Sequence, residues 1–335
     1  MKKSIVLAAA VASLMAGAVQ AESTVYGIAH ASIVSSDVGF GVAAVKNILA
    51  TDNSSRLGFK GNEDLGNGMK VVYQMEMAYD LVDGGGIGAT RNSFVGLAGD
   101  FGTVLVGRHD TPDKSAFYAA GNDHLGDSIV DLNGTYKFQE DRVNNAIAYI
   151  SPALGDLKIA VALVPGEGNG LAGQPGDGLT DGTSVGVMYK AGPIKAGLGI
   201  LDKADAAGVT EDSLMNIGGS YNMGDLTIGL QYQVDEDQAA AGAVATEETI
   251  FAVSAAYKMG ANTLIANFGN NELKSTTGGV STTIDSDAMG LAVKHSMSKK
   301  TTAYVAYSSR DGGSATVAGT LAEATLLAVG LQHKF

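Results

Sequence analysis

The last eleven residues of the chain alternate between two kinds of side chain. One face receives Thr325, Leu327, Val329, Leu331, His333 and Phe335, and the other receives Leu326, Ala328, Gly330, Gln332 and Lys334. Because side chains in a strand alternate with a period of two, the first face is largely apolar and the second is mostly small or polar. A strand of this kind separates hydrocarbon from water. The pattern is typical of the wall of a membrane-spanning barrel.

The start of the chain has the features of a secretory signal. Two lysines precede an apolar stretch over residues 5–19, and Val19-Gln20-Ala21 has the small-x-small form of a cleavage site. We therefore expect a signal peptide at residues 1–21 and a single barrel domain over residues 22–335. After residue 21 no apolar run approaches the roughly 18 to 20 residues that a spanning helix needs.

Composition excludes several classes of partner. Removing Lys2 and Lys3 changes the formal net charge from −13 to −13 − 2 = −15, and nucleic-acid binding requires a basic surface. The chain has no cysteine, so neither a disulfide framework nor a cysteine-ligated metal site is available. We expect no nucleic acid, no metal and no cofactor. The 46 glycines and 5 prolines suit many strands joined by tight turns.

Ring-bearing residues recur just before short turn signals along the second half of the chain. They are Tyr149, Tyr189, Tyr221, Tyr257, His295 and Phe335. The intervals between them are 40, 32, 36, 38 and 40 residues, which predicts one antiparallel hairpin per period. Each hairpin would combine a tight turn with a long loop.

The faces of successive segments agree with one another. Ile217 and Tyr221 share an apolar face in one segment, and Ile228 and Leu230 share one in the next, whereas Gln231 lies on the opposite face. Segments of about 9 to 12 residues are long enough to cross a bilayer at a tilt. Tyrosines at one end of the apolar faces indicate an interfacial girdle; ordinary core tyrosines are the alternative.

Counting these segments predicts sixteen antiparallel strands. They cover residues 24–35, 55–63, 69–79, 91–98, 103–107, 144–150, 157–164, 184–190, 194–201, 214–221, 226–234, 249–257, 262–269, 287–296, 301–309 and 325–335. An even number allows the first and last strands to pair, which leaves no unpaired edge in lipid. A barrel of this size is too wide for side chains to fill, so we expect water inside it.

Four stretches of sequence resemble the Gram-negative general diffusion porins. They are Val25-Tyr26-Gly27, SRLGFKGNEDLGNG at 55–68, RNSFVGL at 91–97 and VGLQHKF at 329–335. The resemblance implies a homotrimer in the outer membrane, in contact with its lipids and lipopolysaccharide, with short periplasmic turns and long extracellular loops. It also implies a third loop folded into each pore, and Phe335 as part of the signal read by the outer-membrane assembly machinery. The Pro-Glu-Phe-Gly-Gly type of motif found in that loop of enterobacterial members is absent here.

The longest unassigned connection, at about residues 109–143, is the candidate for the constriction loop. Long connections without regular structure in compact proteins are usually functional. Its candidate pore carboxylates are Asp110, Asp113, Asp123, Asp127 and Asp131, with Glu140 and Asp141 nearby. A solvated outer loop is the alternative.

A basic wall is expected opposite this loop. Strand parity directs Arg56 and Lys60 inward, because Leu57 and Phe59 suit lipid. The same argument directs Arg91 inward, with Phe94 outward, and Arg142 inward beside Ala146 and Ala148. The resemblance matches Arg56, Arg91 and Arg142 to the basic wall cluster of porins, and guanidinium stays charged at any relevant pH. Arg108 shares parity with Val104 and Val106 and is a candidate anchor for the start of the loop.

Arginines facing carboxylates across a narrow aqueous gap would set a transverse field that favours small polar solutes. Alternatively, each arginine only pairs with a neighbouring carboxylate for structure, and both roles are compatible. Acidic segments such as Asp235-Glu236-Asp237 predict a weak cation preference.

Three other functions remain as alternatives. A substrate-specific channel would need a ladder of aromatic residues for sugars, or many lumenal lysines for phosphate. The sequence shows few aromatic residues and few lumenal lysines. An outer-membrane hydrolase would need a Ser partner for His295 or His333, and none is apparent, so we expect no enzyme. A plugged, non-conducting barrel is the third. The sequence therefore favours a channel for passive diffusion.

Overall fold

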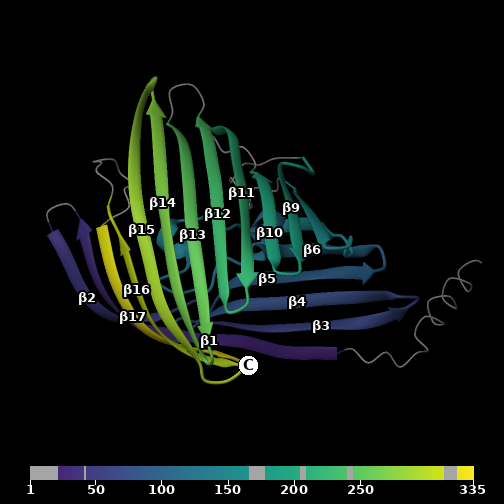
Figure 1. Ribbon diagram of the computed structural model, residues 1–335. Helices are drawn as coiled ribbons and strands as arrows, with labels where there is room; N and C mark the ends of the chain where they lie inside the picture. Colours follow the sequence, from purple (N-terminus) through teal and green to yellow (C-terminus); the bar gives the residue numbers. More distant parts are fainter. Residues whose placement is uncertain (1–21, 41–42, 166–177, 204–208, 240–243, 313–322) are drawn as a thin grey trace, which may run out of the picture.

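The computed structural model describes residues 22–40, 43–165, 178–203, 209–239, 244–312 and 323–335 (Figure 1). The predicted signal peptide at 1–21 lies outside these residues. The strands are β1 (Glu22–Phe40), β2 (Ala43–Asp52), β3 (Arg56–Gly66), β4 (Met69–Asp80), β5 (Gly86–Gly99), β6 (Gly102–Asp110), β7 (Arg142–Ile150), β8 (Leu157–Val164), β9 (Gly182–Ala191), β10 (Ile194–Asp202), β11 (Val209–Met223), β12 (Leu226–Ala239), β13 (Ala245–Met259), β14 (Asn262–Thr277), β15 (Val280–Ser296), β16 (Thr301–Arg310) and β17 (Glu323–Lys334). The helices are α2 (Pro112–Ala119) and α3 (Leu132–Tyr136).

The strands form one antiparallel sheet that closes on itself. Its first and last strands pair from Ile28↔Lys334 to Gly39↔Glu323, and Gly27 and Phe335 exchange backbone hydrogen bonds of 3.1 and 3.2 Å. Of the 17 strands in the sheet, β2 pairs within the described residues only with β1, so 17 − 1 = 16 strands make up the ring. The predicted sixteen-stranded antiparallel barrel is confirmed.

The segment between the first two predicted strands differs from expectation. Residues 36–54 were expected to be a loop, but β1 continues to Phe40 and the chain returns as β2. Both β2 and β3 lie on the same side of β1, because β2 pairs with residues 31–40 and β3 with residues 22–28. The break between them falls at Ser54, whose φ is +56°, and Asp52 Oδ2 accepts a hydrogen bond of 3.1 Å from the Ser55 amide.

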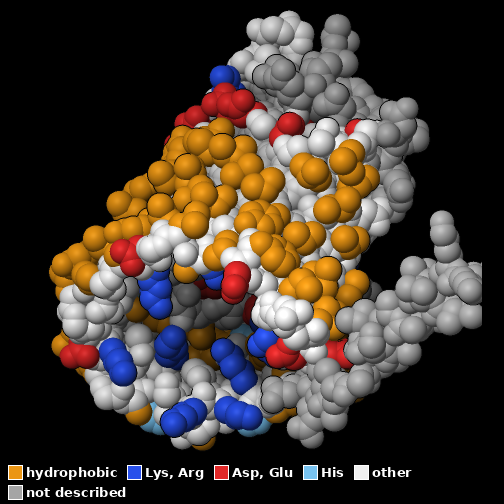
Figure 2. Space-filling model, turned by 90° about the vertical axis from the view of Figure 1, so that its right-hand side faces the viewer, with side chains coloured by type: hydrophobic (Ala, Val, Ile, Leu, Met, Phe, Trp, Pro, Cys, Tyr) orange, Lys and Arg blue, Asp and Glu red, His pale blue; other side chains and the backbone are white. Residues whose placement is uncertain are grey.

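The outer face of the barrel is apolar, as the alternation predicts. Ile217, Leu230, Phe268 and Leu291 are 50, 52, 53 and 47 % exposed, and hydrophobic side chains gather over the outer surface in Figure 2. An apolar surface this extensive costs about 25 cal/mol per Å² in water, and lipid removes that cost. Separately, neither helix in the described part of the chain is long and apolar enough to cross a membrane.

The connection between β6 and β7, residues 111–141, folds into the barrel. Thr111 caps α2, with Pro112 in its first turn, a favourable start for a helix. Further along, α3 packs against β13, β14 and β15, and its Leu132 and Tyr136 are buried in a cluster with Ile250. This loop covers polar side chains of the inner wall, which explains why Gln231 and Gln233 are only 1 and 0 % exposed.

Glycines on the inner wall make room for this loop. A Cβ placed on Gly197 of β10 would lie 2.6 Å from the carbonyl carbon of Ala116, and one on Gly269 of β14 would lie 2.8 Å from the Tyr136 ring. Because these strands have no side chain at the contact points, the loop backbone lies directly against the wall. Gly186 and Gly229 have equally close approaches to Pro112 and to Asn122.

Candidate functional site

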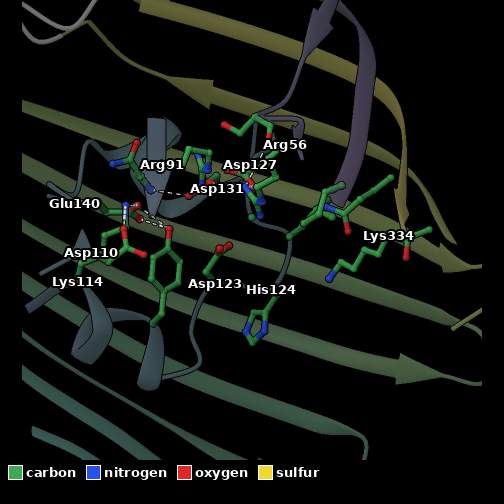
Figure 3. A pocket seen from close by; sticks show the side chains of 18 of the residues that line it. Arg56, Arg91, Asp110, Lys114, Asp123, His124, Asp127, Asp131, Glu140 and Lys334 are labelled. Atoms are coloured by element: carbon green, nitrogen blue, oxygen red, sulfur yellow. Dashed lines mark hydrogen bonds and ion pairs between the residues drawn. The ribbon is translucent and has the colours of Figure 1, made fainter. Parts of the chain in front are cut away.

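A cavity of about 670 Å³ lies between the inner loop and the barrel wall. Figure 3 shows side chains of both charges directed into it from β3, β5 and the loop. Its charged and titratable lining residues are Arg56, Arg91, Asp110, Lys114, Tyr118, Asp123, His124, Asp127, Asp131, Glu140, Arg142, Lys294 and Lys334. The structure therefore brings the three predicted arginines and four of the five predicted carboxylates to one cavity.

Each of the three arginines has a carboxylate partner. Arg56 Nη1 lies 3.1 Å from Asp127 Oδ2 on the loop. Arg142 Nη2 lies 2.7 Å from Asp110 Oδ1. Arg91 Nε lies 2.7 Å from Glu76 Oε1 on the neighbouring strand.

Two other basic side chains lie apart from the cavity lining. Lys60 is exposed on the inner face, with its Nζ 4.8 Å from the centre of the Tyr26 ring. Arg108 donates hydrogen bonds of 2.8 Å to the Thr90 carbonyl and 2.6 Å to Asn144 Oδ1. Arg108 therefore connects β5, β6 and β7 where the loop begins, in agreement with its predicted anchoring position.

The expected direction of Phe94, from which the direction of Arg91 was inferred, is wrong. Phe94 was expected to face lipid, but it packs inward against a cluster that contains Leu105 and Ala148, while Val95 is 56 % exposed. The pairing moves from Met75↔Ser93 to Met77↔Thr90, so β5 has one residue more than β4 over this stretch. This β-bulge reverses the alternation and directs Arg91 into the barrel.

One predicted pore carboxylate does not reach the cavity. Asp113 is 1 % exposed and lies on the outer side of α2, where Asn216 Nδ2 donates to its Oδ1 and Ser184 Oγ accepts from its amide. Burial, with a contribution from the Asp141 charge, raises the pKa of Asp113 to about 7. Its position shows that Asp113 holds the helix against the wall.

The sequence did not single out Lys114, Tyr118 and Glu76 as site residues. Lys114 Nζ lies 3.2 Å from Glu140 Oε2 and 3.6 Å from Asp110 Oδ1, and the Tyr118 hydroxyl donates to Glu140 at 2.7 Å. Glu76 was detectable, because an acidic residue between Met75 and Met77 on a barrel strand must face the lumen. Lys114 had no such signal, because Asp110 ends strand β6 and only Lys114 lies on the helix.

The negative charge of the loop at neutral pH is smaller than its number of carboxylates. Burial, followed by the nearby Glu140 charge, raises the pKa of Asp131 to about 7. Burial and the Asp131 charge raise the pKa of Asp123 well above its usual value. His124 is neutral at pH 7, because burial and the charges of two lysines lower its pKa to about 4.

The arrangement is a charged cavity inside a closed sheet, and comparisons with known proteins agree with this fold. A family model described as Gram-negative porin matches residues 7–314. The chain belongs to the Gram-negative porin family. Membership in this family, with the barrel fold, places the protein in the outer membrane.

Two further comparisons illustrate the similarity. Outer membrane porin protein 32 of Delftia acidovorans is 29% identical over 255 residues, which cover 67% of each chain. The major outer membrane protein P.IA of Neisseria meningitidis serogroup C is 33% identical over 126 residues, 37% of this chain and 32% of that protein. This second match therefore spans about a third of the relative's length.

Solved structures extend the similarity to the whole described barrel. An anion-selective porin from Comamonas acidovorans has a TM-score of 0.74 at 21% identity and covers 94% of this chain and 100% of its own. The trimer form of OmpT of Vibrio cholerae has a TM-score of 0.69 at 18% identity and covers 94% and 99%. At these identities the likeness supports the fold.

Proposed function

We propose that the protein is a water-filled channel for the passive diffusion of small hydrophilic solutes and ions. The observation that supports this most directly is the cavity inside the closed ring, lined by arginines of the wall and carboxylates of the loop. Polar lining of both charges suits hydrated solutes and rejects apolar ones, which would have to lose water without compensation.

In this proposal the passage has a basic wall and an acidic side. The pair of Arg56 and Asp127 joins wall to loop, so these two charges are in direct contact at one edge of the cavity. The charges that line the rest of the cavity from wall and loop create a field that aligns the dipoles of small solutes. Asp113 is left out of this set, because it faces the wall. The basic wall consists of Arg56, Arg91 and Arg142, with Lys60 nearer the β3–β4 turn, and the acidic side consists of Asp110, Asp123, Asp127 and Asp131.

The proposal also includes a weak preference of the channel for cations. Acidic residues pair across strands at the end of the barrel that carries the long loops, where Asp235↔Glu248 and Asp237↔Asp212 lie opposite each other. Like charges placed opposite each other lower stability. Lys203 pairs with Asp212 and Asp235, and cations at the mouth offset the cost that remains at Asp237 and Glu248. We therefore expect weak cation preference, although the Comamonas acidovorans neighbour is described as anion-selective. A reversal potential of anionic sign would contradict it.

A homotrimer is the proposed assembly, supported by the trimer form of the Vibrio cholerae neighbour. Lipopolysaccharide and lipids would surround the exposed apolar face. Phe335 is the proposed contact for the assembly machinery, since it ends the strand that closes the ring and its ring lies against Gly27.

Recording from planar lipid bilayers tests the proposal. The purified protein should give a conductance that rises with salt concentration and is not saturated by any one neutral solute. A silent protein would refute the channel, and saturable block by a single sugar or by phosphate would favour the substrate-specific alternative.

A further inference from the structure

Several lysines of the inner face lie towards the end of the barrel that carries the tight turns, and six of them are treated as one set. We call this set the lysine arc; it consists of Lys60, Lys190, Lys195, Lys258, Lys294 and Lys334. Few lumenal lysines were expected from the sequence, and the strand register corrects that expectation. Figure 2, viewed from the side on which the β3–β4 turn lies in Figure 1, shows Lys and Arg side chains around a hollow.

Contacts with the inner loop or the cavity fix three of these lysines on the inner face. Lys294 Nζ donates a hydrogen bond of 2.7 Å to the His124 carbonyl. A Cβ placed on Gly121 of the loop would lie 2.9 Å from Lys195 Cδ. Lys334 lines the cavity and lies across from Asp123 in Figure 3.

The other three follow from pairing and parity. Lys190 is the direct cross-strand partner of Lys195, and paired residues project to the same face. Lys258 is four residues from Ser254, whose hydroxyl lies 3.3 Å from Nε2 of His124 in the loop. Lys60 lies over the ring of Tyr26, whose hydroxyl donates to Glu76 inside the barrel.

The positive charge of the arc is not cancelled by direct pairing. The ion pairs of the described residues include none of these six lysines. Five of the six side chains are exposed to water. Lys203 pairs with Asp212 and Asp235 at the loop end, but the inward Asp237 and Glu248 are in no ion pair of the described residues. Two zones of opposite sign therefore follow each other along the axis, with these carboxylates at the loop end and the lysine arc at the turn end.

We infer that the channel is electrically polar along its axis, so that it conducts asymmetrically and its ion preference depends on the side from which ions enter. This inference rests on the proposed diffusion function and adds a direction to it. With the loop end positive, cations enter through the acidic zone and anions through the lysine arc, and both accumulate inside. With the opposite voltage each ion must enter through the zone that repels it, so both are depleted.

Salt concentration sets the size of the effect. The Debye length is about 3 Å at 1 M salt and about 30 Å at 0.01 M, so the two zones act on the whole lumen only in dilute solution. In 1 M KCl we expect nearly equal currents at the two polarities. In 0.01 M KCl the current with the loop end positive should be at least about 1.5-fold larger than the current with the loop end negative, because charged surfaces create potentials of several kT. A dilute solution facing the loop end should give cation preference, and one facing the turn end should shift the reversal potential towards anions.

Single channels of known orientation provide the test. The chain has no cysteine, so Thr277→Cys at the end of β14, next to the hairpin turn at the loop end, reports the side of the channel through an impermeant thiol reagent. The variant Lys190→Gln with Lys195→Gln should reduce the asymmetry by at least half in 0.01 M KCl. Its control, Lys46→Gln with Lys274→Gln, removes two positive charges at the loop end and should leave the asymmetry equal or larger.

The outcomes separate the inference from the proposed function. No conductance at all would refute the channel itself. Conducting channels with equal currents at both polarities in 0.01 M KCl, or an asymmetry unchanged by the loss of Lys190 and Lys195, would overturn the axial polarity while leaving diffusion intact. The wild-type measurement is decisive even if a variant does not fold.

Discussion

Replacing Gly197 by alanine should displace the inner loop. The added Cβ would lie 2.6 Å from the carbonyl carbon of Ala116 and closer still to its oxygen, whereas an ordinary contact starts at 3.4 Å. The helix must therefore move by at least about 3.4 − 2.6 = 0.8 Å, because the strand is held by both neighbours and the helix has the cavity on its other side. Overpacking of this kind costs about 1–3 kcal/mol.

The movement should be visible in conductance. Lys114 and Tyr118 extend from the same helix into the cavity, so a shift away from the wall narrows the passage and the single-channel conductance of Gly197→Ala should fall. Gly88→Ala is the matched control, because its Cβ would have an ordinary contact of 3.6 Å with Ala78, and both variants change the unfolded chain equally. If the two variants have equal conductance and equal melting temperature, the loop is not seated by Gly197.

Three further perturbations test the site. Glu76→Gln weakens the partner of the half-buried Arg91 and should lower the free energy of unfolding in urea by about 1–3 kcal/mol; an unchanged value would show that the pair is dispensable. Asp113 has a pKa raised to about 7 by burial, so the folded loop binds more protons than the unfolded one, and its stability should decrease as pH rises from 3.8 to about 7. Hydrogen exchange over residues 111–141 should lose part of this dependence in Asp113→Asn. Arg56→Gln removes a cavity cation and should shift the reversal potential towards cations; a shift towards anions would contradict its role in the wall.

Much of the barrel could be predicted because the bilayer imposes a simple rule on every strand. Side chains such as Ile217 and Leu230 must face lipid, and the period of two then fixes their neighbours. The return strand β2 was not predicted, because neither Lys46 nor Asn47 suits an outward face in lipid. In the described residues it also pairs with β1 alone. Strand ends beyond the apolar band, as at Thr277, are polar and have no alternation that marks them.

The site was predicted in part for a related reason. On an unbroken strand, the alternation of side chains gives the direction of a residue such as Arg56. A bulge interrupts this alternation, so the inward direction of Arg91 was predicted correctly but from a wrong direction of Phe94. The loop sequence has no regular alternation of polar and apolar residues. Nothing in it therefore distinguished Asp113, which faces the wall, from Asp127, which faces the cavity. The wall does hold a signal: isolated glycines within strands, such as Gly197, mark where a backbone approaches closely.

The ion pairs of the cavity connect stability with selectivity. A pair within the wall, such as Arg91 with Glu76, adds little net charge to the passage, because both charges stand on the same side. The pair of Arg56 with Asp127 joins wall to loop, so the same contact that holds the loop also keeps the charge of Arg56 balanced at the edge of the cavity. Neutralising either partner must therefore change both the position of the loop and the field it creates. The three arginines, alike in sequence, are accordingly not equivalent, and the strongest effect on ion preference is expected at Arg56.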